Sequence, residues 1–311
     1  HRESRGLGDV YKRQSEHLLS RGVDLRCIGG KRELDLRHEK DRLVCELAQD
    51  VQVVVNCAAH VGSLKYVTEN AATVYMDNVE MTSTLYRAIS AIRTPPKIVN
   101  IIANCIYDSE ADLLKETDIL SGTVHHSVFS YGMTRRHLIA ASRCLHADRR
   151  INTINLVCPN MYGPHDSDDP SKAHAINALA AKFVRASELG SKYVEVWGSG
   201  RPIREWLYAG DVARLIYDCM QQEWWHDETY LDLNVAQQSG VSISEVVEML
   251  RQEVGTDINP NYLSEYPDGA SRKVMYKGKF VDRFPNFEFT PMKTGISNTI
   301  DFYRRHVDTK N

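Results

Sequence analysis

Short apolar segments alternate with segments of helical spacing along most of the chain, and this alternation constrains the fold more than any other feature. The predicted strands are Leu25–Ile28, Val51–Cys57, Lys97–Ala103, Ile151–Val157 and Leu231–Val235, and the predicted helices are Ser15–Arg21, Lys40–Leu47, Ala71–Ala91, Tyr131–Leu145 and Asp211–Met220. Nearly continuous apolar strands separated by helices indicate βαβ units with right-handed crossovers. We therefore predict an α/β fold with a doubly wound parallel sheet.

The pattern changes after Pro164, where the polar stretch His165–Lys172 reads as a loop. A smaller C-terminal α/β lobe is predicted from the helices Ala173–Ala186, Ser244–Val254 and Met292–Arg304 and the strand Val194–Trp197. The predicted division gives residues 15–163 plus about 205–236 to the larger domain, and 164–204 plus 237–311 to the smaller lobe.

Residues 1–14 are left out of the fold prediction, because Arg5–Gln14 resembles a translated sequencing-library adapter. The glycines of Gly6-Leu7-Gly8 have no strand before them and no third glycine after them. We therefore do not interpret this tripeptide as a phosphate-binding loop.

Composition excludes several classes of protein. The formal net charge of -3 gives no reason to expect a nucleic-acid partner or an anionic membrane surface. No run of 18 apolar residues is long enough to span a bilayer. The seven cysteines lack CxxC spacing, and their odd number argues against a disulfide framework or a zinc site. We expect no metal site and a cytoplasmic location.

Ligands of doubly wound sheets bind at the carboxyl ends of the strands, which here precede Asn56–Gly62, Ala103–Tyr107 and Leu156–His165. Tyr131 and Arg135 lie one helical turn apart on the same face of a predicted helix. A cation near a phenol lowers the tyrosine pKa, which favours proton donation to a carbonyl group. The same pair also occurs as an ordinary surface cation–π contact, so spacing alone leaves both interpretations open.

Three stretches carry a specific resemblance: Asn100–Tyr107 (NIIANCIY), Asn155–His165 (NLVCPNMYGPH) and Val196–Tyr208 (VWGSGRPIREWLY). Together they resemble the extended short-chain dehydrogenases/reductases, which have a Rossmann-like fold. The Cys-Ile-Tyr, Tyr-Gly-Pro-His-Asp and Trp-Gly-Ser-Gly blocks are similar to the GDP-L-fucose synthases within that family. The resemblance runs from about Ser15 to the C-terminus, with the blocks in the family's order.

The resemblance implies an NADPH-dependent enzyme that inverts C3 and C5 of GDP-4-keto-6-deoxy-D-mannose and then reduces the C4 ketone. It implies that Cys105 and His174 exchange the protons of the epimerisations, because they match the family's cysteine and histidine. Tyr131 would be the acid for the ketone, and Arg135 would orient the nicotinamide ribose. A thiol pKa of about 8.5 and an imidazole pKa of about 6.5 suit this exchange near neutral pH.

Two residues depart from the family's reductase machinery. Ala103 stands where the family has a hydrogen-bonding serine, and Arg135 stands where it has a lysine. Asn104 would face away from the position of that serine if the strand continued through it, and could replace the serine only if the strand had already ended. These departures motivate a second reading, a GDP-keto-sugar epimerase without reductase activity. A third reading is a catalytically silent dinucleotide- or sugar-binding protein.

The resemblance also implies binding residues. Lys31 and Arg32 would pair with a 2'-phosphate of NADPH, and the other cofactor-lining positions are Ala58, Ala59, Ala103, Arg135 and Asn160. The GDP-sugar would be bound by Lys182, Trp197, Arg204, Asp268 and Lys273. The family's first strand and glycine-rich loop would fall on the adapter-like residues and are expected to be missing. A homodimer through the helices Ala71–Ala91 and Tyr131–Leu145 is implied by the resemblance as well.

Overall fold

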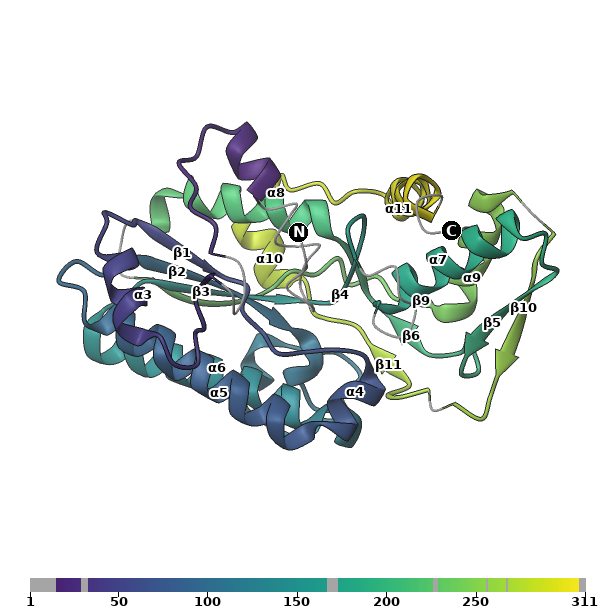
Figure 1. The fold of residues 1–311 in the computed structure, drawn as a ribbon. Helices are drawn as coiled ribbons and strands as arrows, with labels where there is room; N and C mark the ends of the chain where they lie inside the picture. Colours follow the sequence, from purple (N-terminus) through teal and green to yellow (C-terminus); the bar gives the residue numbers. More distant parts are fainter. Residues whose placement is uncertain are drawn as a thin grey trace.

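The computed structural model describes residues 15–28, 33–166, 173–225, 229–255, 257–266 and 268–307. Its main sheet has four parallel strands in the order β1-β2-β3-β8, and helices cover both of its faces (Figure 1). The strands are β1 (Val53–Asn56), β2 (Lys97–Ala103), β3 (Thr153–Cys158) and β8 (Tyr230–Asn234). The predicted doubly wound α/β fold is therefore confirmed.

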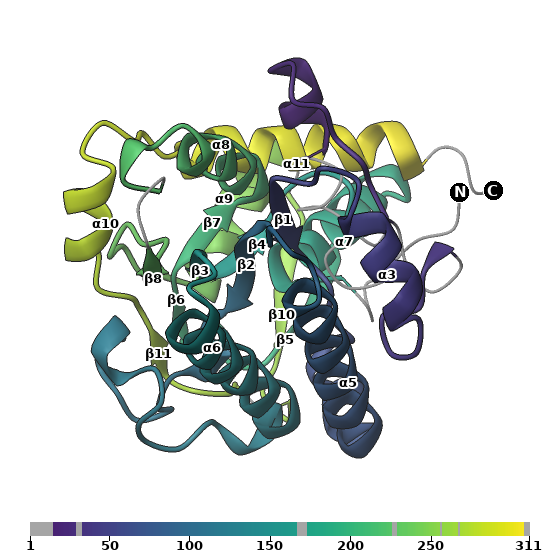
Figure 2. The same cartoon turned by 90° about the vertical axis from the view of Figure 1, so that its left-hand side faces the viewer.

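Alternation of side chains along the strands separates two apolar layers. Ile98 and Ile102 pack beneath α3 (Lys40–Leu47), α5 (Ala71–Ser90) and α6 (Phe129–Arg149). Val99 and Ile101 face α8 (Ala209–Met220) and α10 (Gly278–Arg283) on the opposite side (Figure 2). The helices α3, α5, α6 and α8 agree with the predicted ones to within a few residues at each end, whereas α10 was not predicted. The short elements between them are α4 (Leu64–Glu69) and the 3-10 helices η1 (Asn104–Ile106), η2 (Glu116–Asp118), η3 (His126–Val128) and η4 (Glu223–Trp225).

The prediction of a strand at Leu25–Ile28 is wrong, because residues 23–28 are irregular and follow a short helix at 15–20. A strand exists only through a hydrogen-bonded neighbour, and among the described residues β1 pairs with β2 alone. Val23 and Leu25 instead pack their side chains against the apolar layer beneath α8. The adapter-like residues 1–14 lie outside the described residues.

A row of polar side chains crosses the apolar sheet at one level. Asn56, Asn100, Asn155 and Asp232 are aligned in register across β1, β2, β3 and β8. Each amide Nδ2 donates to the next side chain along the row, with N–O distances of 2.9, 2.8 and 2.7 Å. At the far end Arg143 donates to Asp232 over 2.7 Å, and at the near end Asn56 accepts the backbone N–H of Ala58.

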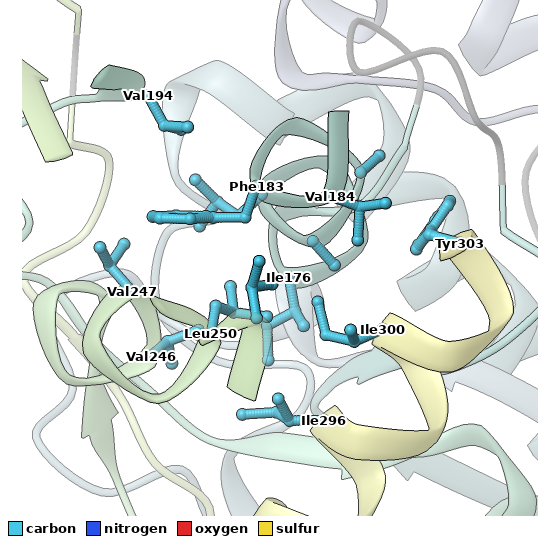
Figure 3. Close-up of a cluster of buried hydrophobic side chains, with 14 of the residues drawn as sticks. Ile176, Phe183, Val184, Val194, Val246, Val247, Leu250, Ile296, Ile300 and Tyr303 are labelled. Atoms are coloured by element: carbon cyan, nitrogen blue, oxygen red, sulfur yellow. The ribbon is translucent and has the colours of Figure 1, made fainter. Parts of the chain in front are cut away.

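A further apolar cluster, separate from the two layers of the main sheet, lies between α7 (Ala175–Glu188), α9 (Ile243–Val254) and α11 (Met292–Val307). Phe183, Leu250 and Ile300 meet there (Figure 3). Small sheets lie on either side of it: β5 (Tyr193–Trp197) with β10 (Asn259–Leu263), β4 (Asn160–Tyr162) with β7 (Trp206–Tyr208), and β6 (Ile203–Arg204) with β9 (Val241–Ser242) and β11 (Arg272–Lys273). Phe280 of α10 and Phe284, which follows this helix, join the main-sheet layer instead, although the predicted division gives residues 237–311 to the smaller lobe.

Candidate active site

Tyr131 and Cys105 pack together at the carboxyl end of β2. They form one buried cluster with Val67 and Val74, and Ala59 and Ala103 pack against it. The sequence permits this close approach because Gly132 follows the tyrosine. A Cβ added at Gly132 would lie 2.8 Å from the carbonyl oxygen of Cys105, so any larger residue would push α6 away from η1.

Arg135 is a buried residue at 2% exposure, not part of a surface cation–π pair. Its Cζ lies 5.2 Å from the centre of the Tyr131 ring. Its Nη2 donates to Asn78 Oδ1 over 2.6 Å, and its Nη1 donates to the Ala58 carbonyl over 3.3 Å. Its buried Nε has no partner among the described residues, so this site lacks an acceptor that a ligand could provide.

Burial sets the proton affinities of the two reactive groups. It raises the pKa of Tyr131 to about 12, although the nearby Arg135 charge works against it. Burial also raises the pKa of the Cys105 thiol, while the positive charges of Lys273 and Arg135 lower it. At neutral pH both groups therefore hold their protons in the ligand-free site.

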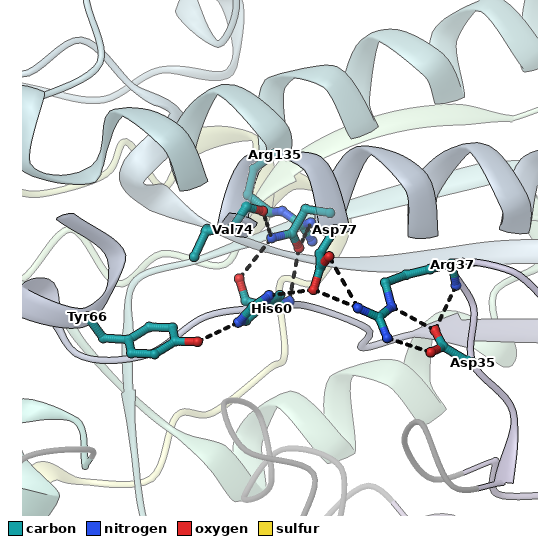
Figure 4. Close-up of polar contacts among 8 residues, drawn as sticks. Asp35, Arg37, His60, Tyr66, Val74, Asp77 and Arg135 are labelled. Atoms are coloured by element: carbon teal, nitrogen blue, oxygen red, sulfur yellow. Dashed lines mark hydrogen bonds and ion pairs between the residues drawn. The ribbon is translucent and has the colours of Figure 1, made fainter. Parts of the chain in front are cut away.

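A polar network missed by the sequence analysis supports Arg135 (Figure 4). Asn78 accepts from Arg135 and from the His60 backbone N–H, and its Nδ2 donates to the His60 carbonyl over 2.8 Å. The His60 ring lies 2.8 Å from Asp77 and 2.8 Å from the Tyr66 hydroxyl. Asp77 in turn pairs with Arg37. The only sequence signal was a pair of polar residues on the buried face of a long helix.

The predicted substrate residues form two groups. Lys182 Nζ lies 5.0 Å from the centre of the Trp197 ring, which is 49% exposed and stacks on Tyr266 at 4.8 Å. Tyr266 was not predicted, because its contact with Trp197 joins residues far apart in the sequence.

In the other group, β6 and β11 place Arg204 beside Lys273, and Arg204 Nη2 donates to the Asp268 carbonyl over 3.2 Å. Burial lowers the pKa values of both cations. Lys273 is near enough to Cys105 for their charges to interact, which links this group to the buried cluster.

The remaining predicted residues lie elsewhere. The backbone N–H and the side-chain Nδ2 of Asn160 both donate to the Glu205 carbonyl. Lys31 and Arg32 lie outside the described residues. Among the residues with assigned structure, no three His, Cys, Asp or Glu side chains are grouped to hold a metal ion, and no helix is long and apolar enough to cross a membrane. Among the described residues, none of the seven cysteines forms a disulfide.

His174 stands at the start of α7 as its N-cap residue, with its side chain 46% exposed. Its Nδ1 lies 3.0 Å from the carboxylate of Asp166, which also accepts the His174 backbone N–H. The surrounding protein disfavours the charged imidazolium, but the hydrogen bond and charge of Asp166 outweigh this effect and raise the pKa of His174. No hydrogen bond joins His174 to Cys105 within the described parts of the chain.

Replacing Asp166 with asparagine is expected to lower the pKa of His174, because the negative charge that stabilises the imidazolium is lost. If His174 must be protonated for proton exchange, the alkaline limb of the exchange rate should move to lower pH. The measurement is the pH profile of solvent-deuterium incorporation into a keto-sugar substrate. An unshifted alkaline limb would show that His174 is not the titrating acid.

The fold and the site define a class of protein: a dinucleotide-dependent α/β enzyme with a buried tyrosine and cation at the strand ends. Residues 11–235 match the model of the NAD dependent epimerase/dehydratase family, and the chain belongs to that family.

Named relatives agree with this assignment. Probable GDP-L-fucose synthase 1 of Oryza sativa subsp. japonica is 27% identical over 94% of this chain and 88% of its own length. GDP-L-fucose synthase of Escherichia coli (strain K12) is 27% identical over 97% of this chain and 94% of its own length. The crystal structure of a GDP-L-fucose synthetase from Naegleria fowleri bound to NADP has the same fold, with a TM-score of 0.80, 20% identity and coverage of 97% of this chain and 94% of that one.

Proposed function

We propose that this enzyme catalyses the NADPH-dependent 3,5-epimerisation and 4-reduction of GDP-4-keto-6-deoxy-D-mannose to GDP-L-fucose, or the same reactions on a close GDP-deoxysugar. One observation carries the proposal: Cys105, Tyr131 and Arg135 are gathered at the carboxyl end of β2, with half-buried cations nearby. The names of the two relatives, both GDP-L-fucose synthases, support the choice of substrate.

Cys105 and His174 have complementary proton roles in this proposal. Carbon atoms next to a ketone are acidic, and inversion needs a base on one face and an acid on the other. His174 is suited to donate a proton, because Asp166 favours its imidazolium form. Cys105 is proposed to remove the other proton; burial raises the pKa of its thiol, and the charges of Lys273 and Arg135 offset part of that effect.

When bound, NADPH supplies the hydride for reduction of the C4 ketone. Burial raises the pKa of Tyr131 to about 12, so the tyrosine is protonated near neutral pH and donates this proton to the ketone oxygen. The unpartnered Nε of Arg135 fits a ribose hydroxyl as acceptor, and Ala58, Ala59, Ala103 and Asn160 are proposed to line the cofactor. Lys31 and Arg32 are proposed to pair with its 2'-phosphate.

The GDP-sugar is proposed to lie across the second lobe. Arg204 and Lys273 are half-buried cations whose lowered pKa values show the cost of their burial, and a diphosphate would offset that cost. Trp197 with Tyr266 offers an aromatic pair for the base, and Lys182 and Asp268 border the same region.

Three wider features are proposed with the activity. The division into an NADP-binding domain and a substrate lobe is supported by the separate apolar clusters, with α10 on the side of the main sheet. A homodimer through α5 and α6 is supported by the exposed apolar side chains of Tyr75, Met76 and Phe129 on these helices. A cytoplasmic location is supported by the seven cysteines, none of which forms a disulfide among the described residues.

The rival without reductase activity rests on Ala103 and Arg135. It would show deuterium exchange at C3 and C5 without NADPH oxidation, and ordinary NADPH turnover would exclude it. A silent binder would bind the cofactor and exchange no protons.

In the decisive experiment, the protein is incubated with GDP-4-keto-6-deoxy-D-mannose in heavy water. The deuterium content of the recovered sugar is then measured by mass spectrometry. We expect deuterium uptake by the wild type and a loss of about 100-fold or more in Cys105→Ser, because the hydroxyl is a far weaker base than the thiolate. Cys144→Ser, at an exposed cysteine on α6, is the matched control. Absence of uptake by the wild type would refute the proposed function.

A further inference from the structure

Asn104 occupies a position that the apolar run of β2 did not predict. The strand ends at Ala103, and Asn104 begins the 3-10 helix η1. In a 3-10 helix successive side chains are separated by about a third of a turn, not by the half turn of a strand. The side chain of Asn104 is therefore not forced to the face opposite Ala103, and the condition under which it could replace the family's serine is met.

The amide of Asn104 is buried and incomplete. The residue is 6% exposed, and its Nδ2 has no hydrogen-bond partner among the described residues. Native structures rarely leave such donors unpaired, because burial without a partner costs free energy. Arg135 Nε is a second unpartnered donor beside the same cluster. Asn104 directly precedes Cys105 in the chain and Arg135 lies over the Tyr131 ring, so both donors are available to acceptor atoms of a bound ligand.

We propose that the Asn104 carboxamide donates a hydrogen bond to the C4 carbonyl oxygen of the GDP-sugar, in place of the hydroxyl that Ala103 lacks. This inference rests on the proposed function. The ketone oxygen has room for two donors, the Tyr131 hydroxyl and the Asn104 Nδ2. A donor at that oxygen polarises the carbonyl for reduction and acidifies the hydrogens at C3 and C5. Asn104 therefore serves both reactions, whereas Tyr131 is needed as an acid for the reduction.

The test compares four proteins: the wild type, Asn104→Ala, the swap Ala103→Ser/Asn104→Ala, and Asn259→Ala. Asn259 is an exposed asparagine of β10 and serves as the matched control. For Asn104→Ala we expect deuterium exchange and NADPH oxidation to fall together by about 100-fold, the effect of removing one preorganised donor. The swap should recover part of both rates, because it returns a hydroxyl donor at the neighbouring position.

Stability separates catalysis from a structural role. Removing an amide whose Nδ2 has no partner among the described residues should leave the melting temperature of Asn104→Ala unchanged or raised, and NADPH binding by fluorescence should be unchanged. A variant that loses rate together with stability and NADPH affinity would show that Asn104 only holds the fold, which overturns the inference.

The wild type distinguishes the two levels of the argument. If it neither exchanges deuterium nor oxidises NADPH with the GDP-keto-sugar, the proposed function fails and the role of Asn104 fails with it. If the wild type is active and Asn104→Ala is equally active, only the role of Asn104 is wrong.

Discussion

Replacement of Asn100 with valine is expected to lower the free energy of unfolding by about 4 kcal/mol, because each buried polar group left unpaired costs about 1–3 kcal/mol. Asn100 accepts from Asn56 Nδ2 over 2.9 Å and donates to Tyr86 and Asn155 over 3.0 and 2.8 Å. All three partners lie in the interior, so water cannot replace the lost amide. Urea unfolding followed by circular dichroism measures the change.

Two further variants make this prediction specific. Asn259→Val alters an exposed asparagine and should change stability by less than about 0.5 kcal/mol. A double-mutant cycle between Asn100 and Asn155 should show strong coupling, because the second replacement removes a partner that the first has already orphaned. A decrease of less than about 1 kcal/mol in the free energy of unfolding of Asn100→Val would contradict a connected row of polar side chains. Additive effects of the Asn100 and Asn155 replacements would contradict it as well.

Tyr131→Phe is expected to lower the rate of NADPH oxidation by about 1000-fold, within the range for loss of a general acid. The phenyl ring keeps the packing against Cys105 and Val74, so the site should remain assembled. Deuterium exchange at C3 and C5 should fall much less, because the proposed function assigns those protons to Cys105 and His174. The two rates are measured on the same protein by absorbance and by mass spectrometry.

The pH dependence sharpens the second prediction. The raised pKa of Tyr131, about 12, keeps the acid form present throughout the working range of the enzyme. The reduction should therefore show no loss attributable to Tyr131 as pH rises from about 6 to 9. Equal losses of exchange and reduction in Tyr131→Phe would mean that the tyrosine supports the whole site and is not a specific acid.

The local pattern of apolar residues along the sequence was sufficient to predict the main strands and helices of this protein. Apolar runs and helical spacing predicted β2 and α3 at their observed bounds, and the alternation of strands and helices predicted the parallel sheet. Period and spacing are properties of neighbouring residues, so one sequence contains them. The resemblance blocks added the choice of Cys105, Tyr131 and Arg135, and the structure brings these three residues together.

The tertiary structure decided which polar groups find partners. The register of the strands joins Asn56, Asn100 and Asn155 into one row, although they look like isolated interruptions of apolar runs. The strand β2 ends at Ala103, and the Nδ2 of the buried Asn104 that follows has no hydrogen-bond partner among the described residues.

Sequence alone determined the main strands and helices and the types of residue proposed to react in this enzyme. Only the folded chain determined the burial that sets the proton affinities of Tyr131 and Cys105, and the contacts of Arg135 with Asn78 and Ala58. Hydrogen bonds and burial depend on groups far apart in the chain, whereas strand and helix periodicity depends on neighbours.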